Sequence, residues 1–188
     1  AVVPLNFPAR CLEPLHASKA DSRFIVGSNS IHETNELVVL RFHSELNELG
    51  IDARLDHPGG PVGVLASNPT DKTLLLTAVQ DSYCLRLWRA PLEAVDRMEE
   101  LDYNPDSDVT AESVLPVENE LEQVAMLNHN IESKVEDVVW RDTTYEDDGV
   151  PGEVVSVDRG GTLMQWDINT SRAVRSESVS RKNDLTPP

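Results

Sequence analysis

The stretch VVSVDRGGTLMQWDI, residues 154–168, decides the fold. Its valines begin an apolar strand, and the sequence DRGG at 158–161 forms a tight turn, because glycine accepts the positive φ that short hairpins require. A second strand then runs through Leu163 to the pair Trp166 and Asp167. A hairpin that ends in Trp-Asp is typical of one blade of a β-propeller.

The same hairpin recurs twice toward the N-terminus. Residues 74–89 contain LLLTAV, a polar turn and YCLRLWR, and residues 24–42 form a third copy that lacks the Trp. Short apolar segments at 62–66 and 135–140 precede two of the hairpins, and we expect them to be the inner strands of blades. Alternating segments that follow the hairpins are expected to be the outer strands; they lie at 51–55, 123–127 and 173–179.

These repeats predict an all-β chain of the WD40 type of β-propeller. A blade takes about 40–45 residues, so the 188 residues hold about three four-stranded blades. Closed rings need at least about four blades and commonly have about seven. We therefore expect a piece of a seven-bladed ring, whose open edges are covered by the remaining blades, either from a missing C-terminal half or from another chain.

The blade boundaries follow from the turn-forming residues that separate the repeats. We expect blade 1 at about 1–57, blade 2 at about 58–129, blade 3 at about 130–180 and a tail at 181–188. Blade 2 carries an acidic insertion at 92–120, which is interpreted either as a solvated loop or as a docking segment for a basic partner. Deletion of 99–120 is expected to leave the fold intact.

Two sets of polar residues are spaced as the hydrogen-bonded networks that tie the strands of a WD40 blade together. Each set takes a His before the blade, a Ser or Thr on its second strand, an Asp in the hairpin and a Trp on the third strand. The alternative for each His is an exposed turn residue. The sets are His57, Thr77, Asp81 and Trp88 in blade 2, and His129, Ser156, Asp158 and Trp166 in blade 3.

Charge and composition narrow the function. The formal net charge is −17, from 16 basic and 33 acidic residues, which argues against nucleic acid and against docking on anionic lipid. The two cysteines, Cys11 and Cys84, have no ligand spacing and are expected to be reduced thiols of an intracellular protein. No apolar run reaches the about 20 residues of a membrane span, so no direct membrane insertion is expected.

Motifs for catalysis or cofactor binding are absent from the sequence. The glycine pairs lack a following Lys-Ser or Lys-Thr, no Gly-x-Ser-x-Gly elbow occurs, and the five histidines lack short metal-ligand spacing. We therefore predict no catalytic residue, no metal site, no cofactor and no enzymatic activity. The partner-binding residues cannot be assigned from these patterns.

Several motifs resemble a known family. FPARCLEP at 7–14, followed by RFIVGS at 23–28, resembles the opening of the EARP- and GARP-complex-interacting proteins. The resemblance reaches about residue 168 and corresponds to the N-terminal half of a family member, with departures at the third blade's turn and across the acidic insertion. Further matches are NELVVLRF at 35–42, ASNP at 66–69, LWRAP at 87–91, VVW at 138–140 and LMQWDI at 163–168.

The resemblance implies a function. It implies a non-catalytic seven-bladed WD40 scaffold that binds the EARP and GARP tether subunits in endosomal recycling and retrograde vesicle traffic. The corresponding location is cytoplasmic, at the trans-Golgi network and endosomes. The alternative is a WD40 adaptor elsewhere, such as a substrate receptor of a ubiquitin ligase; such receptors commonly have an Arg two residues after Trp-Asp, where this chain has Asn169.

Overall fold

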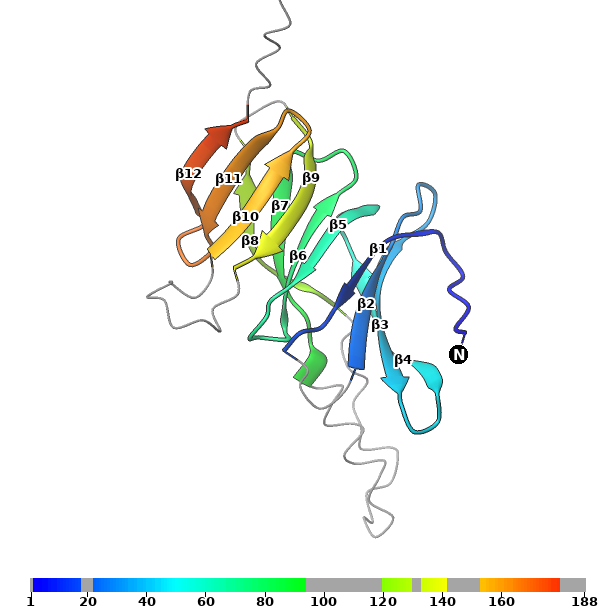
Figure 1. The fold of residues 1–188 in the computed structure, drawn as a ribbon. Helices are drawn as coiled ribbons and strands as arrows, with labels where there is room; N and C mark the ends of the chain where they lie inside the picture. Colours follow the sequence, from blue (N-terminus) through cyan, green and yellow to red (C-terminus); the bar gives the residue numbers. More distant parts are fainter. Residues whose placement is uncertain (1, 18–21, 94–119, 130–132, 142–152, 180–188) are drawn as a thin grey trace, which may run out of the picture.

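The computed structural model describes residues 2–17, 22–93, 120–129, 133–141 and 153–179. Within these residues the chain forms three four-stranded antiparallel sheets, each with its strands in sequence order (Figure 1). The prediction of an all-β chain with three four-stranded blades is confirmed. Blade 1 contains β1 (Ala9–Pro14), β2 (Ser22–Ser28), β3 (Asn35–His43) and β4 (Glu48–His57); blade 2 contains β5 (Val62–Ser67), β6 (Leu74–Val79), β7 (Cys84–Arg89) and β8 (Glu122–Asn128); blade 3 contains β9 (Val135–Trp140), β10 (Glu153–Asp158), β11 (Thr162–Asp167) and β12 (Arg172–Ser178).

The first strands of the blades meet one another, because β1 packs against β5 and β5 packs against β9. The last strands, β4, β8 and β12, form the opposite edges of the sheets (Figure 1). The inner strands predicted at 62–66 and 135–140 are β5 and β9, and the predicted outer strands lie within or largely within β4, β8 and β12.

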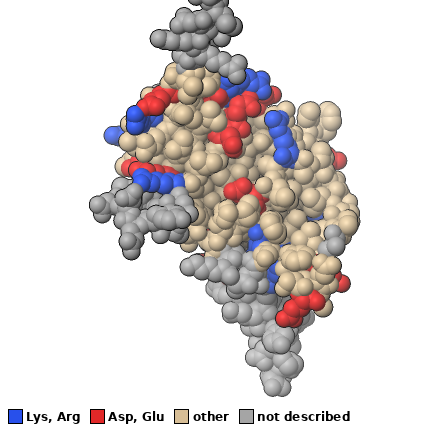
Figure 2. Space-filling model, viewed as in Figure 1, with Lys and Arg blue, Asp and Glu red and all other residues tan. Residues whose placement is uncertain are grey.

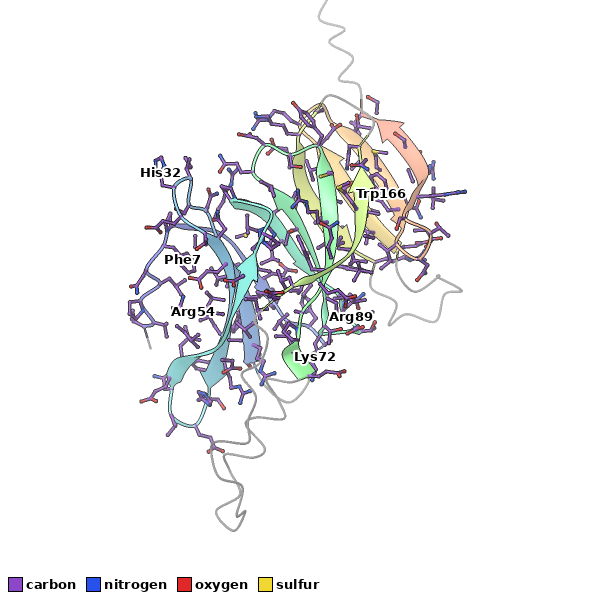
Figure 3. The ribbon with its side chains drawn as sticks, turned by 180° about the vertical axis from the view of Figure 1, so that it is seen from behind. Phe7, His32, Arg54, Lys72, Arg89 and Trp166 are labelled. Atoms are coloured by element: carbon purple, nitrogen blue, oxygen red, sulfur yellow. The ribbon has the colours of Figure 1, made fainter. Side chains whose placement is uncertain are left out.

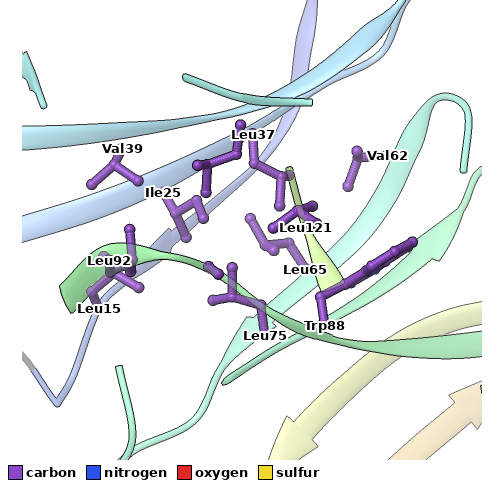
Figure 4. Close-up of a cluster of buried hydrophobic side chains, with 12 residues drawn as sticks. Leu15, Ile25, Leu37, Val39, Val62, Leu65, Leu75, Trp88, Leu92 and Leu121 are labelled. Carbon is purple, nitrogen blue, oxygen red and sulfur yellow. The ribbon is translucent and has the colours of Figure 1, made fainter. Parts of the chain in front are cut away.

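The first hydrophobic core lies between blades 1 and 2 (Figure 4). Successive side chains of a strand point to opposite faces of the sheet, so alternate residues of β3 reach this core. Leu37 and Val39 pack on Leu75 and Trp88 of blade 2, and Leu92 and Leu121 close the core where the chain leaves blade 2 and returns to it. All six side chains are buried.

The second core lies between blades 2 and 3 and uses the other face of blade 2. Leu76 and Ala78 of β6 and Leu87 of β7 pack against Val154 and Trp166 of blade 3. Blade 2 is therefore apolar on both faces, whereas a sheet with one solvated face alternates between apolar and polar residues. This explains why the run LLLTAV at 74–79 is apolar at every position except Thr77.

The two remaining sheet faces are covered differently. Val26, Val38 and Leu40 of blade 1 form a third cluster, on which the N-terminal side chains Val3, Leu5 and Phe7 pack. The corresponding face of blade 3 leaves Val139 and Leu163 exposed, at 57% and 37%. Aliphatic surface of the described part of blade 3 therefore meets solvent on this sheet face.

The insertion predicted at 92–120 lies mostly outside the described residues, as does the tail predicted at 181–188. The residues at and next to the ends of the insertion are described. Leu92 and Leu121 are buried between blades 1 and 2, and Glu120 forms a parallel β-bridge with Asp56 of β4. Deletion of 99–120 would remove this bridge but keep Leu92 and Leu121, so retention of the fold on that deletion stays a prediction.

Gly27 permits a close approach of blade 1 to blade 2. A Cβ at this position would lie 2.6 Å from Sγ of Cys11 and 2.7 Å from Cγ1 of Val62, whereas a Cβ at Gly50 would lie 3.6 Å from its nearest neighbour. We predict that Gly27→Ala lowers the free energy of unfolding by about 1–3 kcal/mol through overpacking, and that Gly50→Ala changes it by less than about 1 kcal/mol. Urea denaturation of both variants checks this, and equal stabilities would contradict the close packing of β2 on β5.

Candidate functional site

A buried hydrogen-bonded network joins blade 2 to the end of blade 1. His57 Nε2 lies 3.0 Å from Oγ1 of Thr77, and Trp88 Nε1 donates to the same oxygen at 2.8 Å. The His57 and Trp88 rings meet edge to face with centroids 5.3 Å apart. His57 ends β4, whereas Thr77 and Trp88 lie on β6 and β7, so the network connects the outer strand of one blade to the middle of the next.

The hydrogen-bond partners fix the direction of this network. Nδ1 of His57 lies 3.0 Å from the carbonyl oxygen of Gly60, which only accepts, so Nδ1 carries the proton in the neutral ring. Nε2 then accepts from the Thr77 hydroxyl, whose oxygen accepts from Trp88. Every polar atom in this set has a partner, as a buried network requires.

Blade 3 repeats the arrangement one blade further along. Nε2 of His129 lies 2.8 Å from Oγ of Ser156, and Trp166 Nε1 donates to Oγ at 2.8 Å. Asp158 is buried, and its Oδ1 accepts from the backbone N–H of Thr162 at 2.8 Å. Nδ1 of His129 and Oδ2 of Asp158 are buried without a hydrogen-bond partner within the described part of the chain.

Asp81 does not join the network of blade 2, so its predicted role there is corrected. Its side chain is exposed and accepts from Nζ of Lys134 at 2.5 Å, in the segment that leads into blade 3. Its φ is 67°, which makes it the left-handed residue of the β6–β7 turn. Gly60 supplies through its carbonyl the acceptor that Asp81 was expected to provide.

The register of the strands explains this difference. Leu75 pairs with Trp88 and Val154 pairs with Trp166, so Thr77 and Ser156 occupy equivalent positions. Asp158 follows Ser156 by two residues and shares its face of the strand, whereas Asp81 follows Thr77 by four and lies beyond the end of β6. The residue equivalent to Asp158 is Val79. In the sequence, the signal that separates Asp158 from Asp81 is the spacing from the hydroxyl residue to the Asp, rather than the spacing from the Asp to the Trp.

The two histidines share burial but differ in their charged neighbours. Burial, together with the charge of Arg86, lowers the pKa of His57 to about 4, although the hydrogen bond to Gly60 opposes the shift. Burial also lowers the pKa of His129, but the carboxylate of Asp158 opposes that shift. Burial therefore favours the neutral form of both rings.

Sequence reasoning missed a buried ion cluster in blade 1. Nε of Arg23 lies 3.0 Å and Nε of Arg41 2.9 Å from the same Oδ2 of Asp52, and all three side chains are largely buried. Asp52 is the extra residue where the register shifts between Val39 and Leu40, which brings its carboxylate between the two arginines. A bulge of this kind leaves no periodic signal in the sequence.

Hollows lie at the ends of the blades. A hollow of ≈ 480 Å³ at the base of the insertion is lined by Asp71, Thr73, Arg89 and Glu122 among others, and it borders residues that are not described. Another, of ≈ 390 Å³, lies where the β2–β3 hairpin meets the β4–β5 connection. Its walls are Glu33, Thr34, Asn35, Asp56, His57, Pro58 and Gly60.

The described residues hold no group of three or more His, Cys, Asp or Glu side chains arranged to bind a metal ion. The buried histidines are engaged in the networks above, and the described cysteines Cys11 and Cys84 are half-buried free thiols. In the same part of the chain, no helix has the length and hydrophobicity to cross a membrane.

The depressed pKa of His57 makes stability depend on pH. The unfolded chain binds a proton at this ring near pH 6.5 and the folded chain only near pH 4, so stability is lost as pH falls through that window. We predict that unfolding free energy falls between pH 6.5 and 5 with a contribution from His57 of up to about 1.4 kcal/mol per pH unit. His57→Gln removes this contribution and gives a shallower slope in urea denaturation; an unchanged slope would contradict the buried neutral ring.

Solved structures match the fold. The WD40 domain of Toxoplasma gondii coronin aligns with a TM-score of 0.50 at 19% identity, covering 83% of this chain and 32% of that one. The C-terminal WD40 domain of Sif2 aligns with a TM-score of 0.52 at 14% identity, covering 90% and 37%. These similarities concern the fold, and no family model matches the sequence.

Curated proteins match the sequence along most of its length. EARP and GARP complex-interacting protein 1 of Rattus norvegicus is 29% identical over 94% of this chain and 44% of its own length. The Homo sapiens protein of the same name is 28% identical over 94% and 43%, and the WD repeat-containing protein DWA2 of Arabidopsis thaliana is 26% identical over 97% and 46%. The chain spans less than half the length of these relatives. The WD40 propeller fold and the resemblance to the EARP- and GARP-complex-interacting proteins are thus both confirmed.

Proposed function

We propose that this chain is part of a non-catalytic WD40 scaffold that binds the EARP and GARP tethering complexes in endosomal recycling and retrograde vesicle traffic. The observation that carries the proposal is the similarity, across 94% of the chain, to proteins named for interaction with these complexes. Fold alone does not decide function, so the proposal rests on that similarity and on the chemistry below.

The chemistry of the described residues favours a scaffold over an enzyme. Perturbed pKa values mark catalytic groups when they occur in a cleft, but His57 and His129 are buried, and His57 meets the hollow beside Pro58 with both of its ring nitrogens already hydrogen-bonded. Their rings bond to Thr77 and Ser156, which gives them a structural role that needs no substrate and no cofactor. We propose that both networks, like the same networks in other WD40 blades, hold neighbouring blades in register.

Charge favours protein partners. The net charge of −17 opposes binding to nucleic acid, whose affinity depends on clustered Lys and Arg. On the face drawn in Figure 2, basic side chains occur in small groups beside acidic ones and form no continuous patch. We propose a cytoplasmic location at the trans-Golgi network and endosomes, reached through the tether subunits rather than by insertion of this chain into a membrane.

We further propose that more blades complete the ring, to a total of seven. Blade 3 ends the described stack with Val139 and Leu163 exposed on a face like those buried between the other blades. A further sheet that covers these side chains removes aliphatic surface from water, as the two described interfaces do. The additional blades come from the rest of a longer protein, as the length of the relatives suggests, or from another chain.

The alternative is a WD40 adaptor in another complex, such as a substrate receptor of a ubiquitin ligase. One relative, the Arabidopsis thaliana protein DWA2, is named only as a WD repeat-containing protein, so the similarity to it is compatible with a WD40 adaptor of another complex. The turn after Trp166 counts against it, because Asn169 stands where such receptors commonly have Arg, and its backbone N–H donates to Oδ1 of Asp167 at 2.9 Å.

Binding to purified tethers tests the proposal. The full-length protein is immobilised and exposed to purified EARP and GARP complexes, with an unrelated WD40 propeller of similar net charge as the control. We predict saturable binding that survives moderate salt, since interface affinity rests mainly on a few buried anchors rather than on rim charges.

Absence of tether binding, together with recovery of cullin-ligase subunits from cells, would replace this proposal with the adaptor alternative. Binding to the control propeller with the same affinity would show that the contact is not specific to this chain.

A further inference from the structure

The hairpin between β2 and β3 presents an apolar side chain to solvent. Ile31 is 83% exposed, although a large aliphatic side chain is stabilised by burial. It lies beside His32, which Figure 3 shows at the tip of the hairpin, directed away from the sheets. A single exposed aliphatic residue needs no explanation by itself, so the surroundings of Ile31 decide whether this one is informative.

The side chain of Asn35 braces the loop that carries Ile31 through four hydrogen bonds. The buried Oδ1 of Asn35 accepts from the Ser28 hydroxyl and from the Ser30 N–H, both at 2.9 Å, and its Nδ2 donates to the Ser30 carbonyl at 3.0 Å. Nδ2 also lies 3.4 Å from the Glu33 carbonyl. The loop therefore loses little further conformational entropy when it binds, which is what preorganisation contributes to affinity.

A hollow lies directly behind this loop. The hollow of ≈ 390 Å³ described above has one wall from the loop, through Glu33 and Thr34, and another from the β4–β5 connection, through Asp56 and Pro58. Its floor includes the buried Asn35 and His57, whose polar atoms are already hydrogen-bonded.

The acidic lining of the hollow favours a partner with a cationic side chain. Glu33 and Asp56 line it, no Lys or Arg does, and neither carboxylate forms an ion pair among the described residues. The nearby Arg54 is engaged by Glu36, with Nη1 at 2.7 Å from Oε1. A cationic side chain that entered the hollow would therefore meet carboxylates without competing for their existing partners.

We propose that the β2–β3 hairpin and this hollow form a docking surface for a protein segment that carries a Lys or Arg side chain flanked by aliphatic residues. The cationic side chain enters between Glu33 and Asp56, and the flanking aliphatic residues cover Ile31. This inference rests on the proposed function, since it names the surface through which the scaffold would hold a protein partner.

Two variants of the full-length protein test the surface, and each has a matched control on the same sheet. Ile31→Ser removes the apolar contact, and the pair Glu33→Lys and Asp56→Lys reverses the charge of the hollow. The controls are Leu46→Ser, at a residue that is 68% exposed, and the pair Glu45→Lys and Glu48→Lys. The control residues lie at or beside the β3–β4 turn, at the opposite end of β3, so they match the chemistry but not the place.

A peptide probe measures the surface without any tether. Fluorescence anisotropy compares binding of Leu-Val-Arg-Val-Leu with that of Leu-Val-Glu-Val-Leu, both with blocked ends. We predict that the Arg peptide binds at least about tenfold more tightly, that the preference falls as salt rises, and that the Glu33→Lys and Asp56→Lys pair abolishes it. Ile31→Ser weakens both peptides, and the control variants behave as the unaltered protein does.

The tether complexes of the proposed function are then bound to the same proteins. Loss of tether binding in the hairpin and hollow variants alone supports both proposals. Tether binding that all variants retain, with no peptide preference, overturns the docking surface and leaves the proposed function standing. A peptide preference that depends on Glu33 and Asp56 without tether binding supports the surface and removes the proposed partner, and the absence of both overturns both.

Discussion

Burial of one sheet face against the next is the constraint on which the structure depends. Each blade is a thin antiparallel sheet that encloses no core of its own, so its apolar side chains leave water only where another blade covers them or, on one face of blade 1, where the N-terminal segment does. Blade 2 is covered on both faces, through Leu75 and Trp88 on one side and Leu76 and Leu87 on the other. Blade 3 is covered on one face, which leaves Val139 and Leu163 as the aliphatic surface that a further blade would cover.

The buried hydrogen-bonded networks also connect neighbouring blades, through polar rather than apolar groups. A Trp side chain provides a large apolar surface for the interface between blades, and its indole N–H then needs an acceptor in that interface. Thr77 and Ser156 provide this acceptor, and the histidines in turn bond to the same hydroxyls. Strand β3 of blade 1 has no Trp, and the outer face of this blade is covered by apolar N-terminal residues instead.

The sequence predicts the repeating elements well and their exceptions poorly. The strands leave a signal because alternation and apolar runs follow from burial on one or both faces, as at 74–79. Asp81 was wrongly assigned to the network because its spacing to the Trp differs by only one residue from that of Asp158. Asp158 lies on a strand, whereas Asp81 lies in the turn. The Gly60 carbonyl, the Asp52 bulge and the hollow beside Asn35 depend on backbone positions that no side-chain pattern records.

Hydrogen–deuterium exchange of the backbone amides in the 188-residue chain is the most direct test of the claim that each blade is stabilised by the sheet faces that cover it. The account predicts the slowest exchange in β6 and β7 of blade 2, which are covered on both faces, and faster exchange in β11 of blade 3. Protection of β11 equal to that of β6 and β7 would contradict it, because blade 3 would then be stable with one face exposed.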